Sequence, residues 1–86
     1  MMGHEEMAAQ VREMLDERGI AYENGEGGDN GEQVTIWNHN GFWIMYTAYT
    51  DENGVTRSRM SVSAGFTSDR RDLDAEAFAR VIEVLS

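Results

Sequence analysis

Four apolar residues near the start of the chain recur at helical spacing and share one face: Met7, Val11, Met14 and Leu15. Charged residues occupy most of the other positions, so the pattern predicts an amphipathic helix over residues 4–18. Gly19 follows where a left-handed residue ends a helix, and Ile20 is placed to make the hydrophobic contact of that stop.

A meander of strands is predicted after this helix. Residues 20–22 are a candidate short strand, whereas residues 23–33 are glycine-rich and acidic, contain no apolar side chain and are expected to form a flexible loop. Apolar runs then predict three strands, at residues 34–37, 42–50 and 55–66. The turns Asn40-Gly41 and Asn53-Gly54 join them, and Asn-Gly is a strong hairpin signal.

A second helix is predicted over residues 75–85, with a buried stripe of Phe78, Val81, Ile82 and Leu85. Asp74 is the expected N-cap, and Leu73 and Phe78 are placed as a hydrophobic staple. The whole chain, residues 1–86, is therefore expected to be a single α+β domain of two layers. The predicted order is α-β-β-β-β-α, an antiparallel meander with both helices on one face.

The register of the sheet follows from the two turns, because opposed residues in an antiparallel pair point to the same side. Two-residue turns predict that one apolar face forms the core under the helices: Val34, Ile36, Trp43, Met45, Met60 and Val62. The opposite face is then rich in aromatic residues and arginine.

Aromatic residues beside arginine on an exposed face are typical of a protein interface. The sequence therefore predicts a partner or dimer interface at Trp37, Phe42, Ile44, Tyr46, Arg57 and Arg59. In one alternative, the arginine stems cover the rings within the monomer. In another, the face stacks bases as single-strand RNA-binding modules do, which the charge of the chain disfavours.

The net charge of the chain disfavours some classes of binding partner. The chain has 16 acidic residues and 7 basic ones, all arginine, for a net charge of −9. Direct binding to nucleic acid or to an anionic membrane is not expected, because both attract cations. The acidity is also compatible with a simple role in solubility or with a genome poor in lysine codons.

Catalytic and metal-binding chemistry is not expected. The chain has no cysteine, which excludes disulfides and thiolate ligands and favours the cytoplasm. No run of about 20 apolar residues occurs, and a signal peptide is not expected. His4 and His39 lie far apart in the sequence, and no phosphate-binding or nucleophile motif occurs. We therefore predict a non-enzymatic protein without a cofactor.

The acidic residues gather near the start of the chain, where residues 1–33 hold nine acids against two arginines, a net charge of −7. In architecture and charge the chain resembles small phage-encoded anti-CRISPR inhibitors that mimic nucleic acid. That resemblance implies carboxylates that occupy a cationic groove on a nucleic-acid-binding effector. The candidates that it implies here are Glu13, Glu17, Glu23, Glu26, Asp29 and Glu32.

Two other functions stay open. The chain resembles acidic secretion chaperones in charge and size, which implies a homodimeric chaperone or immunity-type protein with the aromatic sheet face as its dimer interface. It is also compatible with an accessory domain without separable activity.

Overall fold

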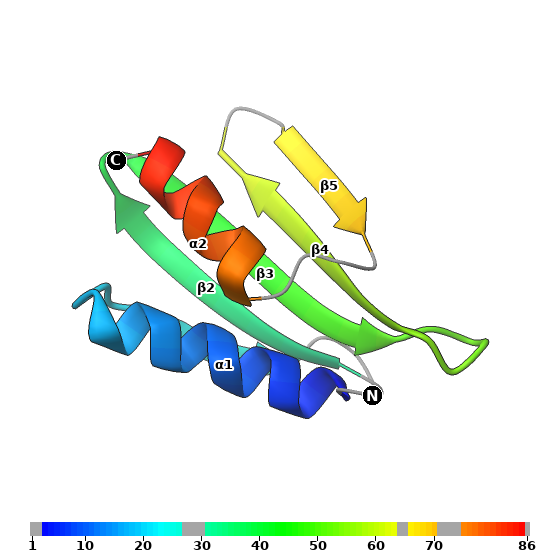
Figure 1. Ribbon diagram of the computed structural model, residues 1–86. Helices are drawn as coiled ribbons and strands as arrows, with labels where there is room; N and C mark the ends of the chain where they lie inside the picture. Colours follow the sequence, from blue (N-terminus) through cyan, green and yellow to red (C-terminus); the bar gives the residue numbers. More distant parts are fainter. Residues whose placement is uncertain (1–2, 27–30, 64–65, 71–74, 86) are drawn as a thin grey trace.

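The computed structural model describes residues 3–26, 31–63, 66–70 and 75–85. Its elements are α1 (His4–Glu17), β1 (Glu23–Glu26), β2 (Gly31–His39), β3 (Phe42–Thr50), β4 (Thr56–Val62), β5 (Phe66–Arg70) and α2 (Ala75–Val84). The strands form one antiparallel sheet in the order β1-β2-β3-β4-β5. Both helices lie on the same face of this sheet (Figure 1). The predicted α+β class and the order of helix, meander and helix are confirmed.

The sheet has more strand than the sequence pattern predicted. The predicted strand at residues 20–22 is not formed, and the predicted loop at 23–33 instead contains β1 and the first residues of β2. β1 pairs with β2 along its whole length, from Glu23 opposite Thr35 to Glu26 opposite Glu32. An edge strand of this kind is stabilised by backbone hydrogen bonds and can form without apolar side chains. The apolar pattern of the sequence therefore could not predict it.

The predicted strand at 55–66 is two strands. The chain reverses after β4, so that Val62 lies opposite Phe66 and β5 runs back along β4 as far as the pair Ser58 and Arg70. Five strands therefore replace the four that were expected. The apolar pattern did not reveal this reversal, because β4 and β5 together read as one long run of strand-forming residues.

The end of α1 is confirmed in detail. Gly19 has a positive φ of 67°, and its N–H donates to the Asp16 carbonyl (3.1 Å), while the Ile20 N–H donates to the Leu15 carbonyl (3.0 Å). These two bonds satisfy carbonyls that the last turn of a helix leaves without partners. Ile20 packs against the core as predicted.

The core lies between the helices and one face of the sheet, and its fully or nearly fully buried side chains come from α1, β2, β3, β4 and α2. Tyr46 is at its centre: its ring lies 5.0 Å from the ring of Phe78, and its hydroxyl donates to Ser58 Oγ (3.2 Å). The Ser58 hydroxyl in turn donates to Met7 Sδ (3.0 Å). Of the predicted α2 stripe, Phe78 and Ile82 are buried, and Val81 and Leu85 are partly buried against the core. The predicted cap at Asp74 and Leu73 lies outside the described residues.

The predicted faces of β2 and β4 are correct, whereas the predicted face of β3 is wrong. Val34, Ile36, Met60 and Val62 are all buried in the core as expected. In β3, however, the buried residues are Ile44, Tyr46 and Ala48. Trp43 and Met45 were expected there and belong to the other face, where Met45 is opposed to Thr35 and Ser61.

Two features of the chain, a bulge in β2 and a three-residue turn after β3, explain why the side chains of β3 point to the face opposite to the predicted one. In β2 the register shifts between Ile36 and His39, so one extra residue is accommodated by a bulge. At the other end, β3 and β4 are joined by a three-residue turn between Asp51 and Val55, in which Gly54 has a φ of 77°. Each irregularity shifts the pairing by one residue, and a one-residue shift moves every side chain of a strand to the opposite face.

Candidate functional site

The solvent side of α1 carries carboxylates in two groups, at residues 5–6 and at residues 13–17. Five exposed acids form what we call the acidic stripe: Glu5, Glu6, Glu13, Asp16 and Glu17. At about 100° per residue, all five fall within an arc of about 120° on the helix. They span about 18 Å along the axis at a rise of about 1.5 Å per residue.

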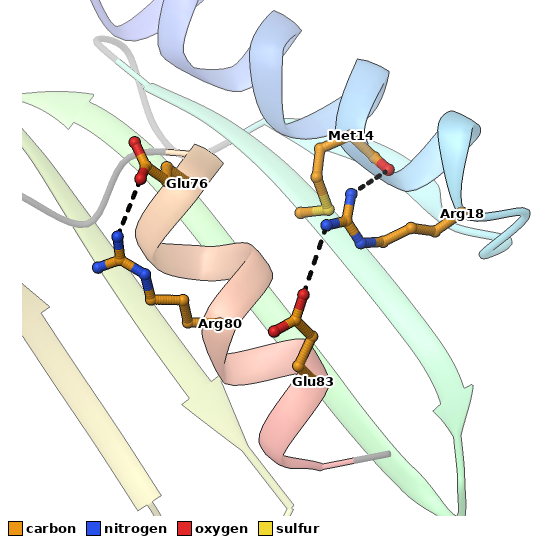
Figure 2. A network of polar contacts seen from close by, with 5 residues as sticks. All are labelled: Met14, Arg18, Glu76, Arg80 and Glu83. Carbon is orange, nitrogen blue, oxygen red and sulfur yellow. Dashed lines mark hydrogen bonds and ion pairs between the residues drawn. The ribbon is translucent and has the colours of Figure 1, made fainter.

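The two arginines nearest the acidic stripe, Arg12 in α1 and Arg18 directly after its last turn, both reach other elements of the chain. Arg12 Nη2 forms an ion pair with Glu32 Oε1 (3.0 Å), and its Nε donates to Asn24 Oδ1 (2.6 Å). Arg18 reaches α2, where its Nη2 lies 3.7 Å from Glu83 Oε1 (Figure 2). These contacts hold α1 against β1, β2 and α2, and neither cation falls among the stripe residues.

The structure does not bring the six predicted acidic residues together. Glu13 and Glu17 belong to the acidic stripe. Glu32 is half-buried on the helix side of the sheet, in the ion pair with Arg12. Glu23 projects from the opposite side, because it alternates with Asn24, which faces α1. The side chain of Glu26 and all of Asp29 lie outside what the structure describes.

Three members of the acidic stripe were missed by the sequence interpretation: Glu5, Glu6 and Asp16. Counting charge by segment drew attention to the glycine-rich stretch, which folds partly into β1 and β2. Projecting residues 4–18 onto a helical wheel would have placed all five acids opposite the apolar stripe.

Asp16 also interacts with the aromatic residue that leads into β1. The pKa of the Tyr22 phenol is raised, first because burial disfavours the phenolate and then because the phenol bonds to the Asp16 carboxylate. The folded chain therefore holds this proton more tightly than the unfolded chain does.

We expect this phenol to make stability fall as pH rises above about 10, the ordinary tyrosine value, because the unfolded state then loses the proton first. Melting temperatures between pH 8 and 11 would measure the effect. Tyr22→Phe should show a shallower decline over that range, and parallel curves for the two proteins would contradict the expectation.

The face of the sheet away from the helices, which we call the open face, differs from the prediction. Phe42, Ile44 and Tyr46 were expected on it, but the last two are fully buried beneath the helices and Phe42 packs against the core. The reversal of β3 explains all three errors. The register and alternation place these residues on the open face: Glu23, Gln33, Thr35, Trp43, Met45, Thr47, Tyr49, Arg57, Arg59 and Ser61.

Arginine and aromatic residues do meet on the open face, with Tyr49 in place of Tyr46. The Arg59 guanidinium lies 5.3 Å from the centre of the Tyr49 ring, and Arg57 Nε donates to the Tyr49 hydroxyl (3.3 Å). The predicted covering of rings by arginine within the monomer therefore holds for Tyr49. It does not extend to the tryptophans: Trp37 is 63% exposed and Trp43 is 40% exposed.

No protein-family model, curated protein or solved structure matches the chain. No helix within the described ranges is long and apolar enough to cross a membrane. In the same ranges, no three histidine or acidic side chains gather as a metal ion would require. The acidic stripe and the open face are the two surfaces from which function can be inferred.

Proposed function

We propose that the chain is a non-enzymatic binding protein that inhibits a nucleic-acid-binding effector, in the manner of a nucleic-acid-mimicking anti-CRISPR protein. The acidic stripe of α1 is the surface that engages the effector. The observation that carries the proposal is the arrangement of five exposed carboxylates along one helix, while Arg12 within the helix and Arg18 directly after it are both directed to partners within the chain.

The spacing of the acidic stripe supports mimicry of a phosphate backbone. Five charges over about 18 Å average about one charge every 4 Å of helix axis, in one group at residues 5–6 and another at residues 13–17. A DNA strand carries one phosphate every 3.4 Å of its own axis, as a general property of the duplex. A cationic groove that accommodates a DNA strand would therefore meet a similar linear density of negative charge on α1.

The net charge of −9 supports the same partner class over longer distances. A strongly acidic protein is steered toward a cationic surface and associates quickly with it. Such an encounter would depend strongly on ionic strength, since the Debye length shrinks to about 8 Å at physiological salt. A chain without cysteine is suited to the reducing cytoplasm in which such effectors act.

The test measures whether the purified chain prevents CRISPR effector complexes from binding target DNA, using a panel of complexes at 50 and 300 mM salt. For a complex that is inhibited, Glu13→Gln with Glu17→Gln should weaken inhibition about fivefold to tenfold at low salt, because each exposed ion pair contributes up to about 1 kcal/mol. The loss should be smaller at high salt. Removing two like charges at i and i+4 should not destabilise α1.

Glu52→Gln with Glu76→Gln is the matched control, because it removes the same net charge from two exposed positions outside the acidic stripe. This control should inhibit as well as the native chain. If both double variants lose inhibition equally, net charge rather than the stripe is responsible. If no complex in the panel is inhibited, the proposed function is wrong for this class of effector.

A further inference from the structure

We infer that the open face is a dimerisation surface, on which a second copy of the chain packs face to face. The two-fold axis runs parallel to the strands, between β2 and β3. This inference concerns the side of the sheet opposite the acidic stripe, so it adds a second surface to the one proposed for the effector.

Two exposed tryptophans lie on the two middle strands of this surface, at the end next to the β2–β3 turn. Trp37 belongs to the bulged segment that faces Trp43, and it alternates with the buried Ile36, so both indoles project from the open face. A two-fold axis between β2 and β3 sets β2 of one copy over β3 of the other. Trp37 of each copy then packs on Trp43 of the other, which removes four indole rings from water in one aromatic cluster.

Charge favours a second copy over an anionic partner. The described side chains of the open face include one carboxylate, Glu23, and two guanidinium groups, Arg57 and Arg59. The described part of the face thus has an excess of a single positive charge, and α1, which carries the acidic stripe, covers the opposite face of the sheet. Two strongly acidic chains can meet there with little repulsion, whereas a nucleic acid would find an excess of only one cation.

The same charges select one arrangement of the two copies. With the axis along the strands between β2 and β3, β1 lies over β4 of the other copy. Glu23 of each copy then lies over Ser61 of the other, two residues along β4 from Arg59, and the approach of Glu23 to Arg59 occurs twice. An axis across the strands would instead set β4 over β4 and bring like charges together, which is unfavourable.

The area of the open face is close to the lower limit for a stable dimer. Four strands spaced by about 4.8 Å, with about seven residues each at about 3.3 Å, cover about 19 Å by 23 Å, or about 450 Å² in projection. The accessible area of a face covered with side chains exceeds its projection. The interface therefore approaches the about 600 Å² per partner at the lower end of stable complexes.

The first test is sedimentation velocity of the full chain from 1 to 500 µM. The native chain should be a dimer in the upper part of this range, and Trp37→Glu should weaken self-association at least thirtyfold, because it places a charge within the aromatic cluster. Val84→Glu is the matched control: Val84 is 83% exposed on α2, so this variant should dimerise like the native chain. Unchanged far-UV circular dichroism would show that both variants are folded.

The second test is a charge exchange across the interface. Glu23→Arg and Arg59→Glu should each weaken the dimer several-fold, and the two changes together should restore the native affinity to within about threefold. A loss of fold in either single variant would appear in circular dichroism, and rescue by the double variant cannot arise from a loss of fold.

Three outcomes would overturn the inference: a monomer at every concentration, a dimer that tolerates Trp37→Glu, or single variants that the exchange does not rescue. Saturable quenching of tryptophan fluorescence by an oligouridine RNA would assign the open face to nucleic acid instead. The variant Glu13→Gln with Glu17→Gln should dimerise normally, so failure of the dimer and failure of the effector proposal can be told apart.

Discussion

Tyr46→Ala is expected to lower the free energy of unfolding by about 3–5 kcal/mol, the range for removing a buried aromatic side chain. The ring of Tyr46 is fully buried against Phe78, and its hydroxyl joins the Ser58 and Met7 contacts inside the core. At about 0.05–0.15 kcal/mol per residue, an 86-residue chain has a total stability of only about 4–13 kcal/mol. The variant should therefore be largely unfolded or close to it.

Urea unfolding followed by circular dichroism would measure this loss, with Tyr49→Ala as the control. Tyr49 belongs to the same strand and is the same residue type, but it lies on the open face, so its replacement should cost much less. Tyr46→Phe isolates the hydroxyl and should cost about 1 kcal/mol. Equal losses at positions 46 and 49 would contradict the register of β3.

Deletion of Asn38 is expected to preserve the register of β3 and to leave a cooperative unfolding transition. Asn38 lies in the bulged segment between Ile36 and His39, where β2 accommodates one residue more than β3. With one residue fewer, the pairs Ile36–Ile44 and His39–Phe42 can both be kept, because one residue then lies between them on each strand. Ile44 and Tyr46 therefore stay beneath the helices, and the packing of the central strand is retained.

The substitution Asn38→Ala removes the side chain but keeps the number of residues in β2, so it separates these two effects. Asn38 Oδ1 accepts a hydrogen bond from the Gly41 N–H (2.9 Å), so this substitution should cost about 1 kcal/mol and leave a cooperative transition. Thermal unfolding followed by circular dichroism would compare the two variants. A deletion variant without a cooperative transition would contradict the pairing of β2 with β3 on either side of the bulge.

The sequence predicted those parts of the fold that local signals determine. The end of α1 could be predicted because Gly19 and Ile20 carry the chemistry of the stop themselves. The core faces of β2 and β4 could be predicted because alternation is preserved within each strand. β3 could not, since its face depends on the number of residues in the bulge and in the turn between Asp51 and Val55, and Asn-Gly turns indicate a reversal without fixing that number.

The candidate surfaces were predictable to different degrees. The excess of acid near the start of the chain was evident, and Glu13 and Glu17 were identified correctly as exposed members of it. Nothing in the spacing of Arg12 and Glu32 shows that they meet, because their ion pair depends on how α1 packs across β2. The aromatic surface was expected on the correct side of the sheet, with half of its residues assigned to the wrong face by the error in β3.

The two outer strands bear on what kind of assembly the chain can form. β1 has only four residues, two of them glutamate, and β5 has five, of which the last two are Asp69 and Arg70. Short, charged edge strands discourage other chains from adding to a sheet, a process that repeats without limit and leads to fibrils. Packing through the open face instead stops at two copies, because a two-fold interface buries the same surface of both chains and leaves none of it for a third. The edge strands β1 and β5 thus disfavour open-ended growth of the sheet, and a dimer is the favoured assembly even at high concentration.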